Sequence, residues 1–126
     1  MIRIALAMIR IALAVAALAA AACSVIATTA AAAERPLRFW NLTLHTISEF
    51  QLAPAGTGNW GENQCKNDRD GTVDSDERLR ITGISPGVYD AKLKDVSGRV
   101  CLVRNIDIKA GDTFSIEEKD LTSCDR

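Results

Sequence analysis

The chain has 126 residues, and its 15 Lys and Arg side chains nearly balance its 16 Asp and Glu side chains, which gives a formal net charge of −1 at pH 7. This balance argues against nucleic acid or an anionic membrane as a partner, because such partners select strongly basic surfaces. The sequence also has no basic stripe with interleaved aromatic residues. We therefore expect no nucleic-acid partner.

Residues 1–33 have the pattern of a secretory signal sequence. They contain two arginines, no acidic residue and a long run of Ala, Leu, Ile and Val. A basic start, an apolar middle and small residues at the end are typical of a cleaved signal. Three alanines precede Glu34 and predict cleavage there. We expect a helical signal peptide, followed by a periplasmic or secreted chain of residues 34–126.

Three alternatives remain open for this segment. The first seven residues, MIRIALA, are repeated at once, so either Met1 or Met8 is the true start. Three alanines before Cys23 loosely resemble a lipobox, which would make the protein a lipoprotein anchored through Cys23. The apolar run is also long enough to span a membrane, but no basic stop-transfer cluster follows it. We expect no stable membrane span after cleavage.

The predicted mature chain, residues 34–126, is sufficient for one small domain. Apolar and polar residues alternate in several short runs, separated by turn signals every 8 to 12 residues. These predicted strands cover residues 37–44, 50–52, 78–84, 88–96, 99–108 and 113–117. We predict an all-β fold, a small antiparallel β-sandwich of six or seven strands, with a small barrel as the alternative. A helical turn is expected in 59–66 or near 119–122.

The clearest hairpin joins the runs 88–96 and 99–108 through Ser97-Gly98. Along its first strand, Tyr89, Ala91 and Leu93 are predicted on one face, and the charged residues between them on the other.

Three cysteines remain in the mature chain, which allows one disulfide and one free thiol. We predict Cys101–Cys124, because the intervening hairpin returns the C-terminal tail toward the strand that contains Cys101. Cys65–Cys101 is the alternative. A loop of roughly 20 residues closed in this way contributes up to about 3 kcal/mol. The cysteines lack CxxC spacing, so we do not expect them to form a metal site.

Two resemblances support this architecture. The segments 84–90 (ISPGVYD) and 95–98 (DVSG) resemble transthyretin-like and carboxypeptidase-regulatory-like β-sandwich modules. The segments 60–64 (WGENQ) and 87–90 (GVYD) resemble those of small exported bacterial β-sandwich proteins of unknown function. Both resemblances imply a β-sandwich with a structural or binding role, and neither implies a specific activity.

Residues 66–77 resemble an EF-hand calcium loop when Gly71 is placed at its sixth position. Position one is Lys66, where an acidic ligand belongs, and neither flank is predicted to be helical. We therefore predict no firmly bound cofactor and at most a weak Ca²⁺ site. As the alternative function, we consider an extracytoplasmic calcium- or small-ligand-binding module built on residues 59–77. The oxygen ligands of this site would be Asp68, Asp70, Asp74 and Glu77.

Trp60 and Asn63 are candidate binding residues in the same polar segment, because an indole can stack on a ligand and donate its N–H. The alternative is that Trp60 folds back to cap one end of the sandwich. His45 is the only histidine, is expected to be exposed, and has no nucleophile elbow near it. We predict no enzymatic activity. The expected function is a non-catalytic exported protein that supports or binds an envelope component or ligand, whose identity is unknown.

Overall fold

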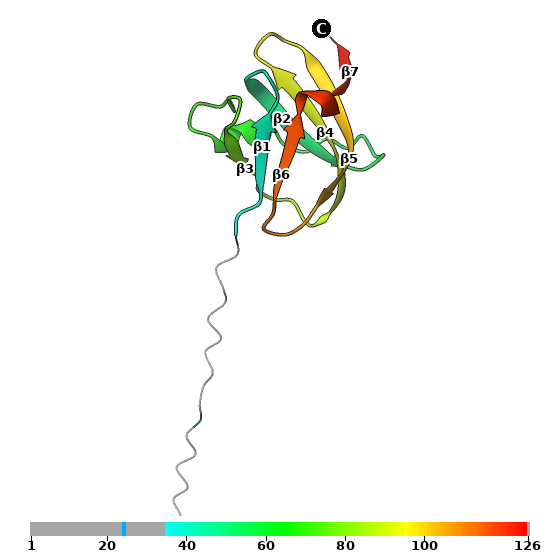
Figure 1. The fold of residues 1–126 in the computed structure, drawn as a ribbon. Helices are drawn as coiled ribbons and strands as arrows, with labels where there is room; N and C mark the ends of the chain where they lie inside the picture. Colours follow the sequence, from blue (N-terminus) through cyan, green and yellow to red (C-terminus); the bar gives the residue numbers. More distant parts are fainter. Residues whose placement is uncertain (1–23, 25–34, 126) are drawn as a thin grey trace, which may run out of the picture. The chain divides into compact units, whose positions relative to one another are not determined.

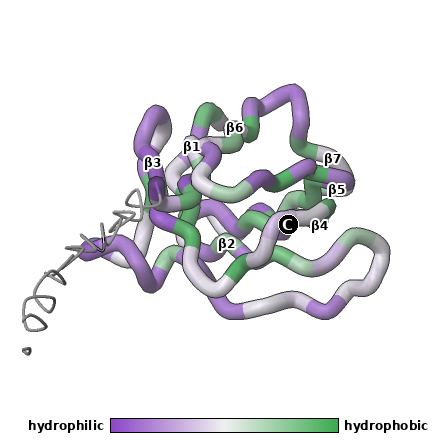
Figure 2. Tube along the Cα trace, turned by 90° about the horizontal axis from the view of Figure 1, so that it is seen from below, coloured by the Kyte–Doolittle hydropathy of each residue, from purple (hydrophilic) through white to green (hydrophobic). Residues whose placement is uncertain are grey.

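The strands of this protein follow the alternation of its sequence. A computed structural model describes Ser24 and residues 35–125. The predicted signal peptide, its cleavage site, the choice between Met1 and Met8, and Cys23 lie outside the described residues. Hydrophobic and hydrophilic residues alternate along the strands (Figure 2). The elements are β1 (Arg38–Leu42), β2 (Ile47–Pro54), η2 (Gln64–Asn67), β3 (Arg78–Arg80), β4 (Gly87–Asp95), β5 (Val100–Ile108), β6 (Thr113–Glu117), η3 (Glu118–Asp120) and β7 (Thr122–Asp125) (Figure 1).

The strands form two sheets, which confirms the predicted all-β sandwich. One sheet has the order β3-β1-β6 and the other has the order β2-β4-β5-β7. The expectation of purely antiparallel pairing is wrong for one pair, because β1 and β6 run parallel from Arg38↔Thr113 to Leu42↔Glu117. Parallel neighbours need a long connection, and residues 43–112 provide it.

The core lies between the two sheets. Phe39 of β1 stacks on Phe50 of β2, with ring centroids 4.2 Å apart, and Phe114 of β6 lies 5.8 Å from Phe39. β1 and β6 contribute alternate side chains to the core, as a half-buried sheet requires. The other faces of both sheets therefore remain available to solvent.

β2 and β3 differ most from their predicted bounds. β2 is longer than predicted, because a register shift between Ile47 and Glu49 breaks its alternation and turns both Ile47 and Phe50 inward. β3 is shorter and ends at Arg80. The last strand, β7, was not predicted, because all four of its residues are exposed and give no alternation. The two short 3-10 helices, η2 and η3, confirm the predicted helical turns.

Asp90 is the main exception in the predicted hairpin. The alternation predicts it on the same face as Lys92 and Lys94, opposite Ala91, but a register shift between Tyr89 and Ala91 leaves it 1% exposed. Its carboxylate accepts hydrogen bonds from the backbone N–H groups of Gly56 and Asn105 and pairs with Arg104 at 3.1 Å. The two backbone hydrogen bonds, followed by Arg104, lower the pKa of Asp90, while burial opposes this. The charged group is therefore fully paired.

Across the described residues, none of the helices has the length and apolar character required to cross a membrane.

Candidate functional site

The polar segment 59–77, predicted as the ligand loop, covers the edge of β2. The N–H of Gly61 donates to the carbonyl of Leu52 at 2.9 Å. Further along, Ile47 and Val73 exchange two backbone hydrogen bonds of 2.9 and 2.8 Å. Edge strands with unpaired backbone groups are liable to associate with other chains. The segment therefore protects β2 through hydrogen bonds without forming a regular strand of its own.

Asn63 and Gln64 fasten this segment to β2 and to the residues that follow β3. The side-chain oxygen of Asn63 accepts hydrogen bonds from the N–H groups of Phe50 and Cys65, both at 3.0 Å. The Gln64 amide donates to the carbonyl of Thr82 at 2.9 Å and accepts from its N–H at 3.0 Å. Asn63, a predicted binding residue, thus uses its oxygen inside the fold.

Trp60, the other predicted binding residue, is half-buried beside the outer face of the four-stranded sheet. The ammonium of Lys92 lies 4.9 Å from the centroid of its ring, and Lys92 is on β4. A shallow hollow of about 190 Å³ is present on the same face. We call this surface the lysine face. It comprises Glu49, Gln51, Lys92, Lys94 and Val100, with Trp60 beside it.

The four predicted calcium ligands do not form a common site in the part of the chain that is described. No three His, Cys, Asp or Glu side chains among residues 35–125 are grouped as a metal ion requires. Glu77 instead accepts a hydrogen bond from the N–H of Asp74, and Asp74 accepts one from the hydroxyl of Thr46. Asp68 and Asp70 are not hydrogen-bonded to either of them. Calcium binding at this loop stays a prediction.

The cysteines pair as predicted. Cys101 and Cys124 form a disulfide with an S–S distance of 2.05 Å. Cys65 is free and buried, so the alternative pairing with Cys101 does not form. Burial, followed by the negative charges of Asp68 and Glu49, raises the pKa of the Cys65 thiol to about 12. This thiol is therefore protonated at neutral pH and is a poor nucleophile.

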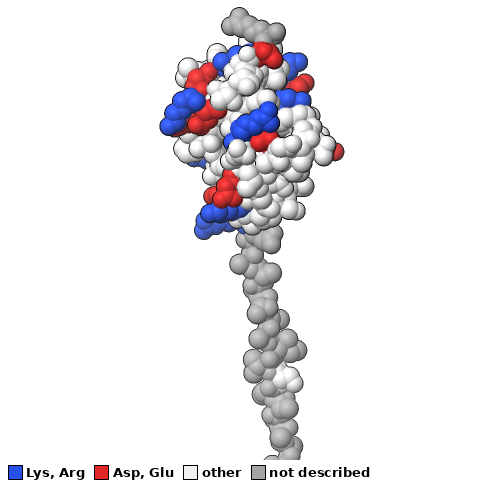
Figure 3. Space-filling view, turned by 90° about the vertical axis from the view of Figure 1, so that its right-hand side faces the viewer, with Lys and Arg blue, Asp and Glu red and all other residues white. Residues whose placement is uncertain are grey.

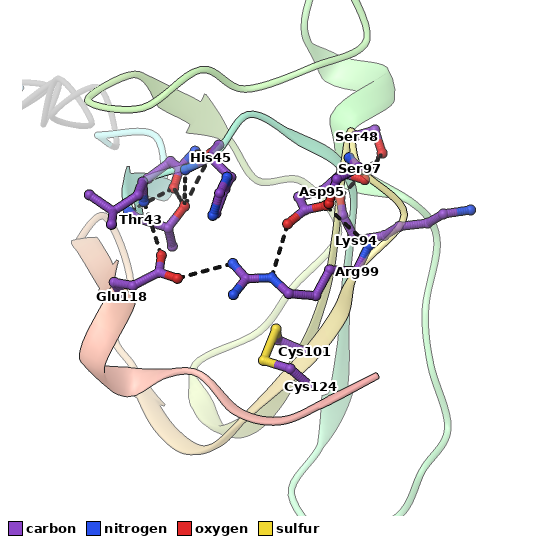
Figure 4. Close-up of polar contacts among 12 residues, drawn as sticks. Thr43, His45, Ser48, Lys94, Asp95, Ser97, Arg99, Cys101, Glu118 and Cys124 are labelled. Carbon is purple, nitrogen blue, oxygen red and sulfur yellow. Dashed lines mark hydrogen bonds and ion pairs between the residues drawn. A yellow bond between two sulfur atoms is a disulfide. The ribbon is translucent and has the colours of Figure 1, made fainter. Parts of the chain in front are cut away.

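His45 is exposed, as predicted, and lies near a charged network that joins the two sheets (Figure 4). Arg99, at the start of the β5 side of the hairpin, pairs with Asp95 and with Glu118, each at 3.0 Å. Glu118 also accepts a hydrogen bond from the N–H of Leu44 at 3.0 Å. The network therefore links the β4–β5 turn of one sheet to η3, which follows the other.

The carboxylates of this network are held in their charged forms. Burial raises the pKa of Asp95, but hydrogen bonds from the hydroxyl of Ser97 and from Arg99 outweigh it and lower the pKa to about 2. The N–H of Leu44, followed by Arg99, lowers the pKa of Glu118 against the effect of burial. A general acid needs the opposite shift, so the network is suited to holding the sheets together.

A second surface lies on the outside of the three-stranded sheet, and we call it the arginine face: Arg38, Arg78, Arg80 and Trp40. Because Phe39 and Leu79 point into the core, the residues on either side of them point outward. The pairing of β1 with β3 sets Arg38 opposite Arg80 and Trp40 opposite Arg78.

Within the described part of the chain, the three arginines of the arginine face form no ion pair, although the carboxylate of Asp76 lies beside Trp40. All three arginines are exposed, and none of them is within ion-pair distance of a carboxylate among the described residues. The Arg78 guanidinium lies 4.1 Å from the centroid of the Trp40 ring. The Trp40 indole N–H donates to Asp76 at 3.0 Å, which fixes the ring.

Other parts of the surface are more balanced. The face drawn in Figure 3 has small groups in which Lys or Arg lies beside Asp or Glu, separated by uncharged surface. On the lysine face, Glu49 lies opposite Lys94 in the pairing of β2 with β4. The arginine face is thus a local excess of charge on a chain whose overall charge is small.

Sequence reasoning missed the arginine face, because its residues are far apart in the chain. Along the sequence there is no basic stripe with interleaved aromatics, but the pairing of β1 with β3 brings three arginines together around one tryptophan on a sheet surface. The available signal was the spacing of Arg38 and Trp40, and of Arg78 and Arg80, each around one apolar residue. That spacing places both members of a pair on one face of a strand.

No protein-family model, curated protein or solved structure matches this chain. The likeness to transthyretin-like modules and to small exported β-sandwich proteins therefore stays a prediction, and function is argued from the geometry alone.

Proposed function

We propose that this chain is an exported, non-catalytic binding protein that holds an anionic component of the cell envelope on its arginine face. The observation that carries the proposal is the group of three exposed arginines without a carboxylate partner among the described residues. Like charges directly opposite each other on paired strands destabilise a sheet, as Arg38 and Arg80 must do here. An anion between them relieves that repulsion.

Export is supported by the sequence pattern of residues 1–33 and by the Cys101–Cys124 disulfide. Disulfides persist in oxidising compartments such as the periplasm or the extracellular space and are rare in the cytosol.

The absence of catalysis is proposed from the groups that could perform it. The thiol of Cys65 is buried and has a raised pKa. Asp95 and Glu118 have lowered pKa values and are engaged with Arg99. None of these three groups has the properties of an activated nucleophile or a general acid.

Site-directed photocrosslinking in cells tests the proposal. A photoreactive residue at Ser115, beside Trp40 in the β1–β6 pairing, is expected to form a covalent adduct with an envelope component. The same residue at Gln51, on the lysine face, is the control and is expected to form none. Adducts from Gln51 alone, or none from Ser115, contradict the proposal.

The intact mass of the protein recovered from the envelope fraction tests export separately. A chain that begins at Glu34, with one disulfide and one free thiol, is expected. A chain that begins at a lipid-modified Cys23 places the protein on a membrane surface, and a chain that retains residues 1–33 contradicts cleavage.

A further inference from the structure

We infer that the ligand of the arginine face is a linear acidic polysaccharide, an inference that rests on the proposed function. The first reason is the rigidity of one basic group, Arg78. Arg78 is stacked on Trp40 at 4.1 Å, and Trp40 is hydrogen-bonded to Asp76 at 3.0 Å. A guanidinium held in this way loses less freedom when it binds an oxyanion, and its planar fork matches a carboxylate or sulfate in two hydrogen bonds.

The second reason is the arrangement of the charges. Side chains two positions apart on a strand, such as Arg78 and Arg80, are separated by about 6.5–7 Å along the strand. Directly opposite residues, such as Arg38 and Arg80, have Cβ atoms about 5 Å apart. Three positive charges at these spacings on an open sheet match a polymer that carries an anionic group in each repeating unit.

A single small anion is a poorer fit. The arginines are exposed, and a single exposed ion pair contributes little binding free energy. Several weak contacts on one connected ligand reinforce each other, because the later contacts form at high effective concentration. An extended polyanion is therefore expected to bind this face more tightly than a single small anion does.

The third reason is the row of hydroxyls beside the arginines. Thr113 and Ser115 of β6 are exposed and lie opposite Arg38 and Trp40 in the pairing of β1 with β6. β6 is also the edge strand of its sheet. Hydroxyl groups both donate and accept hydrogen bonds. This row can therefore form hydrogen bonds with the sugar hydroxyls that lie between the charged groups of a polysaccharide.

Nucleic acid fits the face less well. Sequence-tolerant binding of single strands uses aromatic rings on which bases stack. Trp40 is the only aromatic residue of the arginine face, and Arg78 lies over its ring.

A lipid bilayer is also a poorer fit. Surfaces that bind membranes combine basic residues with apolar side chains that enter the lipid. The large apolar side chains that are well exposed in the described part of the chain are Leu44, Val88 and Val96. None of them belongs to β1, β3 or β6, the strands of the arginine face.

Binding of the exported, processed protein to polygalacturonate tests the inference. Calorimetry at low salt is expected to show binding that weakens as salt is raised, and none to uncharged dextran. The double variant Arg38→Gln/Arg80→Gln is expected to bind at least tenfold more weakly. The matched variant Lys92→Gln/Lys94→Gln removes the same charge from the lysine face and is expected to remain within twofold of the unchanged protein. Thermal unfolding of both variants checks that they are folded.

Three results would overturn the inference. One is no binding to polygalacturonate at low salt. Another is an equal loss in both double variants, which indicates general electrostatic attraction. The third is tighter, arginine-dependent binding to vesicles that contain anionic lipid or to single-stranded DNA. If crosslinking from Ser115 in cells still depends on Arg38 and Arg80 in any of these cases, only the ligand class is wrong. If that crosslinking is absent, the proposed function itself fails.

Discussion

The two flanks of the sandwich are closed by different chemistry. On the β2–β3 flank, Asn63 and Gln64 connect β2 to Thr82, two residues beyond β3, through neutral amide hydrogen bonds. On the β6–β7 flank, the ion pair of Arg99 with Glu118 joins the β4–β5 turn to η3, and the Cys101–Cys124 disulfide fixes β7 to β5 within the four-stranded sheet. Amides do not titrate and are not reduced, whereas carboxylates respond to pH and disulfides respond to redox potential. The β2–β3 flank is therefore insensitive to pH and redox potential, whereas the β6–β7 flank depends on both.

Among the changes that test the two flanks, removal of the disulfide is expected to lower the stability of the protein most. The two cysteines are 23 residues apart in the chain, and the entropy of a loop of that size corresponds to about 3 kcal/mol of stability. The variant Cys101→Ala/Cys124→Ala, measured by urea unfolding, is expected to lose about this amount. Reduction of the unchanged protein with dithiothreitol serves as the second measurement. A loss below about 0.5 kcal/mol in both would show that β7 contributes little to the fold.

Asn63→Ala tests the other flank. It leaves the N–H groups of Phe50 and Cys65 without their acceptor, and each unsatisfied donor costs about 1–3 kcal/mol when it is buried. Because both hydrogen bonds are only partly buried, a total of about 2–3 kcal/mol is expected. Asp70→Ala, an exposed change in the same segment, is the control and is expected to stay within about 0.5 kcal/mol. Equal effects would contradict the role of Asn63.

Acid is expected to loosen the β6–β7 flank first. The pKa of Asp95 is lowered from 3.8 to about 2 in the folded protein. At a pH between these two values, the unfolded state therefore binds more protons than the folded state. The contribution of Asp95, about 2 kcal/mol, is present above about pH 5 and is lost as the pH falls toward 2. Glu118 shifts in the same direction.

Hydrogen exchange measures where that loosening occurs. Between pH 5 and 3, after correction for the intrinsic rate, the N–H of Leu44, which donates to Glu118, is expected to lose protection. The N–H of Phe50, which donates to Asn63, is expected to keep it. A parallel loss at both sites would show that the flanks open together.

The smallest effect concerns the arginine face, which lies between the flanks. Arg80→Thr removes the repulsion with Arg38 and is expected to stabilise the protein by about 0.2–1 kcal/mol at low salt, with less effect at high salt. Arg104→Thr is the matched control, because Arg104 pairs with the buried Asp90, and it is expected to destabilise the protein. Thermal unfolding at two salt concentrations compares them. Destabilisation by Arg80→Thr would mean that Arg80 has a structural partner.

The sequence was sufficient for the features that depend on local pattern. Alternation predicted the hairpin of β4 and β5. The Cys101–Cys124 pairing is as predicted, but the hairpin expected between these cysteines does not form, because β5 and β6 lie in different sheets and β7 returns to pair with β5. Alternation could not predict β7, whose four residues are all exposed and follow no pattern. β7 is held instead by its neighbour β5 and by the disulfide.

The features that sequence reasoning missed arise from contacts between distant segments. Asn63 was interpreted as a ligand residue, because nothing in the sequence shows that it accepts hydrogen bonds from Phe50 and Cys65. The arginine face requires β1 to pair with β3, and the parallel β1–β6 pair requires the chain to return over about 70 residues. Pairing partners at such separations are set by the whole fold.

The position of β1 has a consequence for how the protein is made. β1 is the first strand in the chain, yet it lies in the middle of its sheet, between β3 and β6. Both neighbours are synthesised later, and residues 43–112 lie between β1 and β6. The three-stranded sheet therefore cannot close until β6 has been synthesised. Such long-range pairing forms slowly, because a large loop must be ordered before its contacts contribute stability.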